Sequence, residues 1–154
     1  VVLILIGTGQ EKEKLVSYTL KHGIDNVYFF PAQEKELIPA CLKQMDVLYI
    51  GLQKQPLFRF GISPNKMFDY MASGHPTLSN IQTRNDIFVD NHCGMTIEAG
   101  SPQAMADGIL KFAQMDPAEY ENYCHNATET VKEYDFGYLT DRLEEILKKE
   151  VEEK

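Results

Sequence analysis

The sequence predicts an α/β fold in which a parallel sheet is wrapped by helices, and three observations lead to this prediction. Short apolar runs alternate along the chain with stretches of helical periodicity. The first apolar run, residues 1–6, is rich in β-branched residues, as in strands that are buried on both faces. A glycine turn, Gly7-Thr8-Gly9, follows at once, as in the strand-to-helix loops that contact ligands in such sheets. Such turns also need glycine for backbone geometry alone.

The predicted strands and helices follow one another along the chain, with Gly and Pro residues between them. Pro39 lies inside the second predicted helix, so this helix must break or begin late. Residues 51–62 and 80–91 are predicted loops, the second with a short helix through residues 86–89. Strands are predicted at residues 1–6, 26–30, 47–50, 76–79 and 94–98, and longer helices at residues 10–22, 34–44, 64–73, 101–112, 116–131 and 136–150.

The stretch from Phe60 to Pro76 predicts a loop that leads into a helix. Ser63 fits the N-cap and Pro64 fits the first helical position. Gly74 then ends the helix, and Pro76 prevents it from resuming. Helical spacing divides the side chains of this helix into an apolar, core-facing side and a polar side. The apolar residues are Met67, Phe68, Met71 and Ala72, and the polar residues are Asn65, Lys66, Asp69 and Ser73.

Lys66 departs from the usual pattern at the start of a helix. The third position after a serine cap favours Glu, which completes a capping box and suits the positive end of the helix dipole. A lysine there is unfavourable unless an anion lies at the same helix end. Backbone amides, a flanking glycine and a lysine together form a phosphate site, and Asp69, one turn further on, has a carboxylate that accepts hydrogen bonds from ribose hydroxyls. The alternative is a capped surface helix with a solvated lysine.

The charge distribution favours a small anionic ligand over a nucleic acid. The formal net charge is −8, which argues against a general nucleic-acid binder. Residues 47–84 hold four basic residues and one acid, so their net charge is 4 − 1 = +3, against −11 for the rest of the chain. Chance clustering is the alternative explanation. The four basic residues are Lys54, Arg59, Lys66 and Arg84.

The cysteines and histidines predict no metal site. The three cysteines, Cys41, Cys93 and Cys124, form neither a metal pattern nor an obvious disulfide framework, which favours a reducing cytoplasm. None of the four histidines pairs with a Cys or a carboxylate at metal-ligand spacing, and His75 is expected to be a turn residue rather than a neighbour of the ligand. No apolar run approaches transmembrane length, and the absence of an initial Met suggests a fragment of a longer protein.

These motifs, in this order, resemble the C-terminal half of a group-1 retaining glycosyltransferase of the GT-B fold. Within that family the chain most resembles bacterial transferases of capsule, polysaccharide and lipopolysaccharide assembly that have an SPNK-type loop. The resemblance covers essentially the whole chain and implies one Rossmann-like nucleotide-sugar-binding domain, with helices on both faces of a parallel sheet. It rests on Gly7-Thr8-Gly9, residues 26–30, residues 45–47, residues 61–74 and the pair Cys93-Gly94.

The resemblance also implies roles for particular residues toward a nucleotide-sugar donor, UDP- or GDP-linked, with no cofactor and no metal. Asp69 aligns with the second of two family glutamates and would contact the ribose. The first glutamate would fall at Gly61, so it is missing here, although glycine allows a close approach of the backbone. The segment at Phe30 and Pro31 would border the base, and Gly7, Thr8 and Gly9 would lie at the cleft. The donor diphosphate would be bound by Gly61, Ile62, Ser63, Asn65 and Lys66.

A second departure concerns catalysis. The Arg and Lys that act in the family lie before the strand that opens this chain, as does the N-terminal domain that binds a glycan or lipid-linked acceptor. The isolated chain is therefore expected to have no transferase activity, and the whole protein to act in the cytoplasm or at the inner face of the membrane. The alternatives are a nucleotide-sugar epimerase of GT-B architecture, which the SPNK loop disfavours, and a non-catalytic nucleotide-binding domain.

The last predicted helix suggests a surface for self-association. Leu139, Leu143, Ile146 and Leu147 lie at helical spacing. In GT-B proteins the C-terminal helix commonly packs on the N-terminal domain, and without that domain an open apolar stripe favours contact between copies of the chain.

Overall fold

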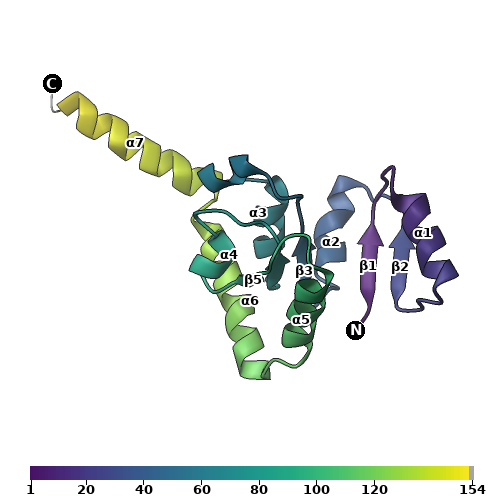
Figure 1. Ribbon diagram of the computed structural model, residues 1–154. Coiled ribbons are helices and arrows are strands. Elements are labelled where there is room, and N and C mark those ends of the chain that lie inside the picture. Colours follow the sequence, from purple (N-terminus) through teal and green to yellow (C-terminus); the bar gives the residue numbers. More distant parts are fainter. Residues whose placement is uncertain (153–154) are drawn as a thin grey trace. The chain divides into compact units, whose positions relative to one another are not determined.

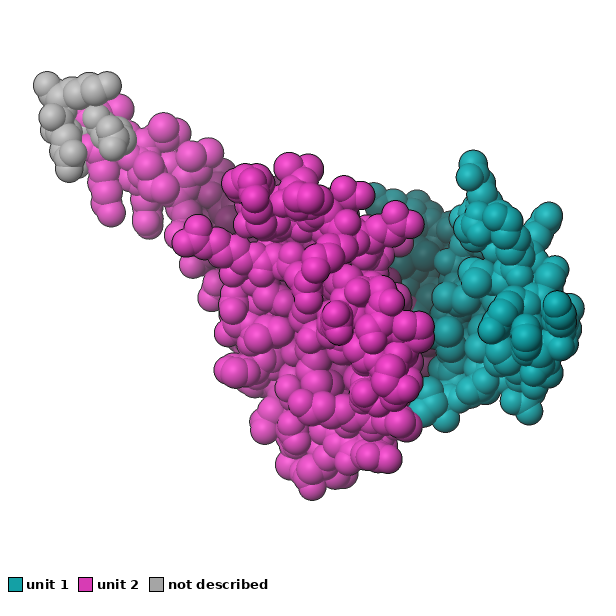
Figure 2. Space-filling view, in the orientation of Figure 1, with its two compact units in different colours: residues 1–41 teal, residues 42–154 magenta. Residues whose placement is uncertain are grey.

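The computed structural model describes residues 1–152 and divides into two compact units, residues 1–41 and the chain from residue 42 onward (Figure 2). Both units contain a parallel sheet flanked by helices, which confirms the predicted α/β fold class. The sequence led us to expect one sheet of five strands. The hydrogen bonds instead define a two-stranded sheet in the first unit and a three-stranded sheet in the second, so each unit is described by itself.

The first unit is a strand-helix-strand arrangement. Strand β1 (Leu3–Ile6) pairs in parallel with β2 (Val27–Phe30), and helix α1 (Lys12–Lys21) connects them (Figure 1). The register places Ile6 opposite Phe30, so the carboxyl ends of both strands lie at the same edge.

Pro39 predicts a break or a late start of the second predicted helix, and the late start is confirmed. A 3₁₀ turn, η1 (Lys35–Leu37), precedes the short helix α2 (Ile38–Leu42). Pro39 therefore lies in the first turn of α2, where its missing N–H costs no intrahelical hydrogen bond.

The second unit is built on the sheet β3 (Leu48–Ile50), β4 (Thr77–Ser79) and β5 (Gly94–Thr96), in that order and all parallel. Gly94 permits the close approach of β4 and β5, because an added Cβ would collide with the Thr77 carbonyl oxygen. The 3₁₀ helix η2 (Pro56–Phe60) lies within the stretch predicted as a loop.

Five α-helices belong to this unit, and three begin with a side-chain cap. Asp86 accepts hydrogen bonds from the amides of Phe88 and Val89, Ser101 accepts one from Ala104, and Asp116 caps the following helix in the same way. The starts predicted at Ser101 and Asp116 are confirmed. The helices are α3 (Asn65–Ala72), α4 (Ile87–Asp90), α5 (Pro102–Ala113), α6 (Pro117–Lys132) and α7 (Phe136–Glu152) (Figure 1).

The core of the second unit joins the sheet to α3, α4 and α6. Met71 and Ala127 are fully buried where α3 packs on α6, and Phe88 and Cys93 close the core beside β5. This packing fixes α3 against the sheet, and with it the loop before α3. The buried cluster is Ile50, Met67, Met71, Ile81, Phe88, Cys93 and Ala127.

The predicted apolar residues of α7 are present and exposed. Leu143, Ile146 and Leu147 each expose 56% of their surface and Leu139 exposes 40%. Among the described residues, no helix is long and apolar enough to cross a membrane.

Candidate anion-binding site

One residue, Asn80, connects the loops at the carboxyl ends of β3 and β4. The backbone N–H of Asn80 donates to the Ile50 carbonyl oxygen at 3.2 Å, and its side-chain Oδ1 accepts from the Leu52 backbone amide at 2.8 Å. Ligands of parallel α/β sheets bind at this edge, so Asn80 holds the loop after β3 on the relevant side of the unit. The sequence analysis missed Asn80. The available signal was an asparagine placed directly after a predicted strand.

The loop between η2 and α3 turns at Gly61. Its amide donates to the Phe58 carbonyl oxygen at 3.0 Å and ends η2. Its φ of 107° lies in the region that side chains rarely adopt, and an added Cβ would meet no atom within 4 Å. Glycine is therefore required here by the backbone conformation and not by crowding.

The start of α3 differs from the prediction. Ser63 is not the N-cap and Pro64 is not the first helical residue, because the helix begins at Asn65 and Pro64 is the cap, without a side-chain cap hydrogen bond. The backbone of Pro64 accounts for the shift, because its ψ of 134° is extended and excludes it from the helix. Lys66 is thus the second helical residue and not the third.

This shift leaves a helix end with free donors. The Met67 amide bonds to the Pro64 carbonyl oxygen at 3.0 Å, but the amides of Asn65 and Lys66 precede the first intrahelical hydrogen bonds. Among the described side chains none caps them, so they are available to an anion.

The faces of α3 are largely as predicted. Met67 and Met71 are buried, Phe68 is half-buried, and Asn65, Lys66 and Asp69 are exposed.

Ala72 was expected in the core, but it is exposed and Tyr70 is half-buried instead. The Tyr70 hydroxyl donates to the Tyr49 carbonyl oxygen at 3.3 Å, which links α3 to β3. Burial raises the pKa of Tyr70, and the nearby Asp69 carboxylate raises it further. Gly74, with φ of 80°, ends the helix as predicted.

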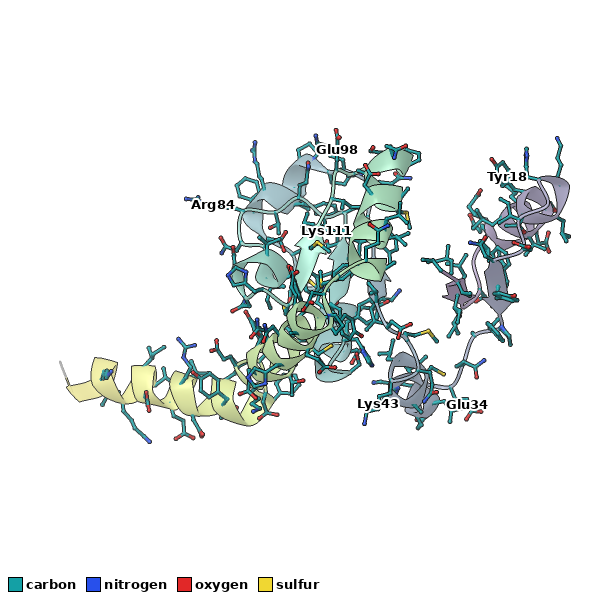
Figure 3. All side chains as sticks on the ribbon, turned by 90° about the horizontal axis from the view of Figure 1, so that it is seen from below. Tyr18, Glu34, Lys43, Arg84, Glu98 and Lys111 are labelled. Carbon is teal, nitrogen blue, oxygen red and sulfur yellow. The ribbon has the colours of Figure 1, made fainter. Side chains whose placement is uncertain are left out.

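Four cations lie in or beside this loop-helix segment, and all four are exposed: Lys54, Arg59, Lys66 and Arg84. Among the described side chains, the lysines that form ion pairs are Lys14, Lys132 and Lys148, so none of these four is neutralised by a carboxylate. The Arg59 guanidinium lies over the Phe60 ring, 4.7 Å from its centroid. Arg84 points away from the ribbon (Figure 3). The segment therefore offers positive charge and unbonded amides, which suits a phosphate-bearing ligand.

The residues predicted at the cleft lie at the carboxyl edge of β1 and β2, within the first unit. Gly7 follows β1 with φ of 143°, and its amide donates to the Phe30 carbonyl oxygen at 3.3 Å. Lys12, which the sequence analysis missed, donates from Nζ to the carbonyl oxygens of Gly7 and Phe30 at 2.8 and 2.6 Å. Thr8, Gly9 and Pro31 are exposed around this point.

Other residues considered from the sequence have structural surroundings. His75 precedes β4 at the amino edge of the sheet, with its Nδ1 3.4 Å from the Tyr120 hydroxyl, which supports its role as a turn residue. Cys41, Cys93 and Cys124 are free, and burial raises the pKa of the Cys93 thiol to about 11. Within the described part of the chain, no group of three or more His, Cys, Asp or Glu residues is placed to hold a metal ion.

A parallel α/β fold with an uncapped, lysine-bearing helix start is an arrangement typical of nucleotide-binding domains. The chain belongs to the glycosyl transferases group 1 family, whose model matches residues 1–148. No curated protein matches it in a sequence search.

Solved structures share the fold at low sequence identity. Sucrose-phosphate synthase from Thermosynechococcus elongatus matches with a TM-score of 0.75 and 15% identity, over 99% of this chain and 39% of that one. Anabaena HepE in complex with UDP and glucose matches with a TM-score of 0.71 and 16% identity, over 96% and 40%. WaaG, described as a glycosyltransferase involved in lipopolysaccharide biosynthesis, matches with a TM-score of 0.67 and 18% identity, over 94% and 37%. The chain thus spans about two fifths of the length of these proteins.

Proposed function

We propose that this chain is the donor-binding half of a glycosyltransferase that moves a sugar from a nucleotide-sugar to a glycan or lipid-linked acceptor. The observation that carries the proposal is the start of α3, which follows the turn at Gly61 and holds two amides and a lysine that have no partner among the described residues. A leaving nucleoside diphosphate gains negative charge as the glycosidic bond breaks. Cations and amide donors already in place stabilise that charge without reorganisation.

Each residue at the start of α3 has a proposed role toward one part of the donor. The amides at Asn65 and Lys66, together with the Lys66 ammonium, bind the diphosphate, and the flanking residues Gly61, Ile62 and Ser63 shape the approach to it. Asp69 is exposed one turn along the same face of α3 and binds the ribose hydroxyls. The Asp69 carboxylate reaches less far than a glutamate carboxylate would, because Asp has one methylene fewer.

The related structures support a nucleotide-sugar donor. HepE has been solved in complexes with UDP, with UDP and glucose, and with UDP-glucose. This favours a UDP-linked donor here, with GDP as the competitor. WaaG belongs to lipopolysaccharide biosynthesis, which favours a role in bacterial surface polysaccharide assembly on the cytoplasmic side.

We also propose that this chain alone does not transfer sugar and that no metal takes part. The acceptor-binding site and the remaining cations would be supplied by the rest of a protein whose relatives are about two and a half times as long as this chain. The group 1 family match favours transfer over epimerisation. Sugar transfer catalysed by the isolated chain would contradict this part of the proposal.

The exposed leucines of α7 support the proposal that copies of the isolated chain associate. Light scattering at rising concentration tests it, and a monomer throughout would argue against it.

The donor site is tested by following backbone amide signals by NMR while UDP, GDP or ADP is added. We expect shifts centred on residues 61–69, largest with the correct base, that disappear in Lys66→Ala. Lys111→Ala, which removes an exposed lysine from the last turn of α5, serves as the matched control and should behave as the wild-type chain (Figure 3). Shifts that persist in Lys66→Ala would contradict the assigned site. If this chain gives no shifts, the same titration is repeated on the full-length protein. Unchanged amide signals in the full-length protein would overturn the proposal.

A further inference from the structure

The loop after β3 is attached to the sheet by a hydrogen bond that a side chain provides. The parallel ladder between β3 and β4 uses every second amide of β3, beginning with Leu48, which donates to the Pro76 carbonyl oxygen at 3.0 Å. Leu52 follows Ile50 in this series, and its amide donates to Oδ1 of Asn80 at 2.8 Å. The Asn80 side chain therefore extends the attachment of the chain to the sheet by two residues beyond the end of β3.

Asn80 is itself held in place on both sides. Its neighbours in sequence, Ser79 and Ile81, are each only 2% exposed, so its backbone is fixed at the edge of the core. The Asn80 side chain also faces the Tyr49 hydroxyl. Burial raises the pKa of Tyr49, and a hydrogen bond from the Asn80 side chain partly offsets that rise. With its oxygen on the Leu52 amide and its NH₂ group toward Tyr49, the Asn80 side chain has one orientation.

The far end of the same loop is held by the 3₁₀ helix η2. The Phe58 amide donates to the Gln55 carbonyl oxygen at 3.1 Å, and the Phe58 side chain packs against the buried core. Only residues 53 and 54 thus lie between the two attached points, Leu52 and Gln55. A connection this short leaves the backbone of Lys54 little freedom.

Lys54 is the single charged residue in the stretch from residue 47 to residue 58. Its side chain is exposed, and the ion pairs among the described residues do not include it. A lysine on a freely moving loop contributes little to binding, because ordering the loop costs conformational entropy. A lysine on an attached loop avoids most of that cost. The attached loop continues through η2 and Gly61 into α3, whose start carries the free amides and Lys66.

We propose that Lys54 is a second cation of the anion site at the start of α3, and that Asn80 is the positioning residue that holds it there. The Lys54 ammonium contacts the diphosphate, whereas Asn80 does not contact it and acts through the loop. The proposal rests on the proposed function, since it needs an anion at α3. It has a specific consequence: the Asn80 side chain matters for anion binding only while Lys54 is present.

The test measures the affinity for inorganic pyrophosphate by isothermal titration calorimetry on a double-mutant cycle. The four proteins are the wild-type chain, Asn80→Leu, Lys54→Gln and the variant with both changes. Leu is similar in size to Asn but accepts no hydrogen bond, so Asn80→Leu releases the loop. Lys111→Gln, which removes an exposed lysine from α5, is the matched control for the loss of one positive charge.

We expect each single variant of the cycle to lower the affinity about threefold to fivefold, the range for an exposed ion pair. The double variant should lose no more than either single variant, because both changes remove the same contact. Lys111→Gln should bind as the wild-type chain does. Wild-type affinity in either single variant would overturn the proposal. A loss in the double variant equal to the product of the single losses would also overturn it, because Asn80 would then act independently of Lys54.

A ligand-free measurement tests the attachment of the loop. Amide hydrogen exchange at Leu52 should accelerate in Asn80→Leu and stay slow in Asn80→Asp, which keeps an acceptor oxygen at this position. Exchange at the Gly61 amide, which bonds to the Phe58 carbonyl oxygen, should be unchanged in both variants. Unchanged exchange at Leu52 in Asn80→Leu would overturn the positioning role. Faster exchange at both amides would do the same, because it would show a general loss of structure.

Lys66→Gln separates this proposal from the proposed function. If Lys66→Gln weakens pyrophosphate binding and Lys54→Gln does not, the anion site stands and the role of Lys54 is wrong. If neither this chain nor the full-length protein binds pyrophosphate, the proposed function fails and the role of Lys54 fails with it. The hydrogen exchange at Leu52 would then still show whether Asn80 holds the loop.

Discussion

The two units each place a lysine in the first turn of a helix that follows a glycine-containing loop, yet the two lysines have opposite surroundings. Lys12 in α1 donates to two backbone carbonyl oxygens and is half-buried. Lys66 in α3 is exposed, and no hydrogen bond or ion pair to its ammonium is formed within the described residues. A lysine at the start of a helix can thus be stabilised in two ways, by acceptors within the chain or by an anion that binds from outside.

Binding an anion from outside requires a helix that keeps its position when the anion is absent. Helix α3 meets this need through its buried face, where Met71 is fully buried against the core and Tyr70 bonds to the Tyr49 carbonyl oxygen. The buried face therefore maintains the geometry, and the exposed face is free to bind. Substitutions on the two faces should have different consequences.

The largest expected effect is on stability, from the buried face of α3. Met71→Ala removes a fully buried side chain, and we expect the free energy of unfolding to fall by about 2–5 kcal/mol. Urea denaturation followed by circular dichroism measures this. Ala72→Ser, at the exposed neighbouring position, should change stability by no more than about 0.5 kcal/mol. Similar losses in both variants would show that the two faces are not distinct.

The next effect is on affinity, from the exposed face. Lys66→Ala should weaken UDP binding about tenfold or more, because a charged hydrogen-bond donor to phosphate is lost. The UDP affinity of the wild-type chain should fall with added salt, and this dependence should be smaller in the variant. Fluorescence or calorimetric titration at two salt concentrations gives both values. An equal salt dependence in the two proteins would contradict the assignment of this cation to the ligand.

A smaller effect is expected at Asp69, which is exposed on the same face. Asp69→Asn keeps the size of the side chain but removes the charge that strengthens hydrogen bonds from ribose hydroxyls, so UDP binding should weaken about threefold to tenfold. Pyrophosphate binding should stay the same or strengthen slightly, because a repulsive charge is removed. Weaker binding of pyrophosphate in this variant would show that Asp69 supports the site generally and does not act on the ribose.

The smallest effect is the direct contrast of the two lysines in thermal unfolding without ligand. Lys66→Met removes an uncompensated cation from the start of α3 and should stabilise the chain by about 0.3–1 kcal/mol. Lys12→Met removes two hydrogen bonds along with the cation, so it should be neutral or destabilising by about 1 kcal/mol. Equal shifts of the melting temperature in the same direction in both variants would contradict the different surroundings of the two lysines.

The sequence was informative wherever local chemistry decides structure. The caps at Ser101 and Asp116, the stop at Gly74 and the late helix start at Pro39 each follow from one or two residues, and each was predicted. The start of α3 was predicted one residue too early, because Ser63 and Pro64 form a good cap and first helical residue on composition. The extended backbone at Pro64 depends on the loop from Gly61, which composition does not specify.

The parts that could not be predicted depend on contacts between segments distant in sequence. Lys12 and Phe30 are 18 residues apart, and Leu52 and Asn80 are 28 apart, so neither hydrogen bond has a local signal. The exposure of Ala72 and the partial burial of Tyr70 likewise depend on how α3 is rotated against β3 and α6. The candidate site was predicted as a segment, residues 61–69, but the side chains that support it were not.

The central claim is that the start of α3 is an anion site completed by Lys66, and titration with inorganic pyrophosphate tests it most directly. Pyrophosphate has the diphosphate group of the donor without base, ribose or sugar, so only the diphosphate site can respond. We predict that amide signals of residues 61–69 shift in the wild-type chain and in Lys111→Ala, and that Lys66→Gln lowers the affinity about tenfold. Equal affinity in Lys66→Gln and the wild-type chain, or shifts centred outside this segment, would contradict the account.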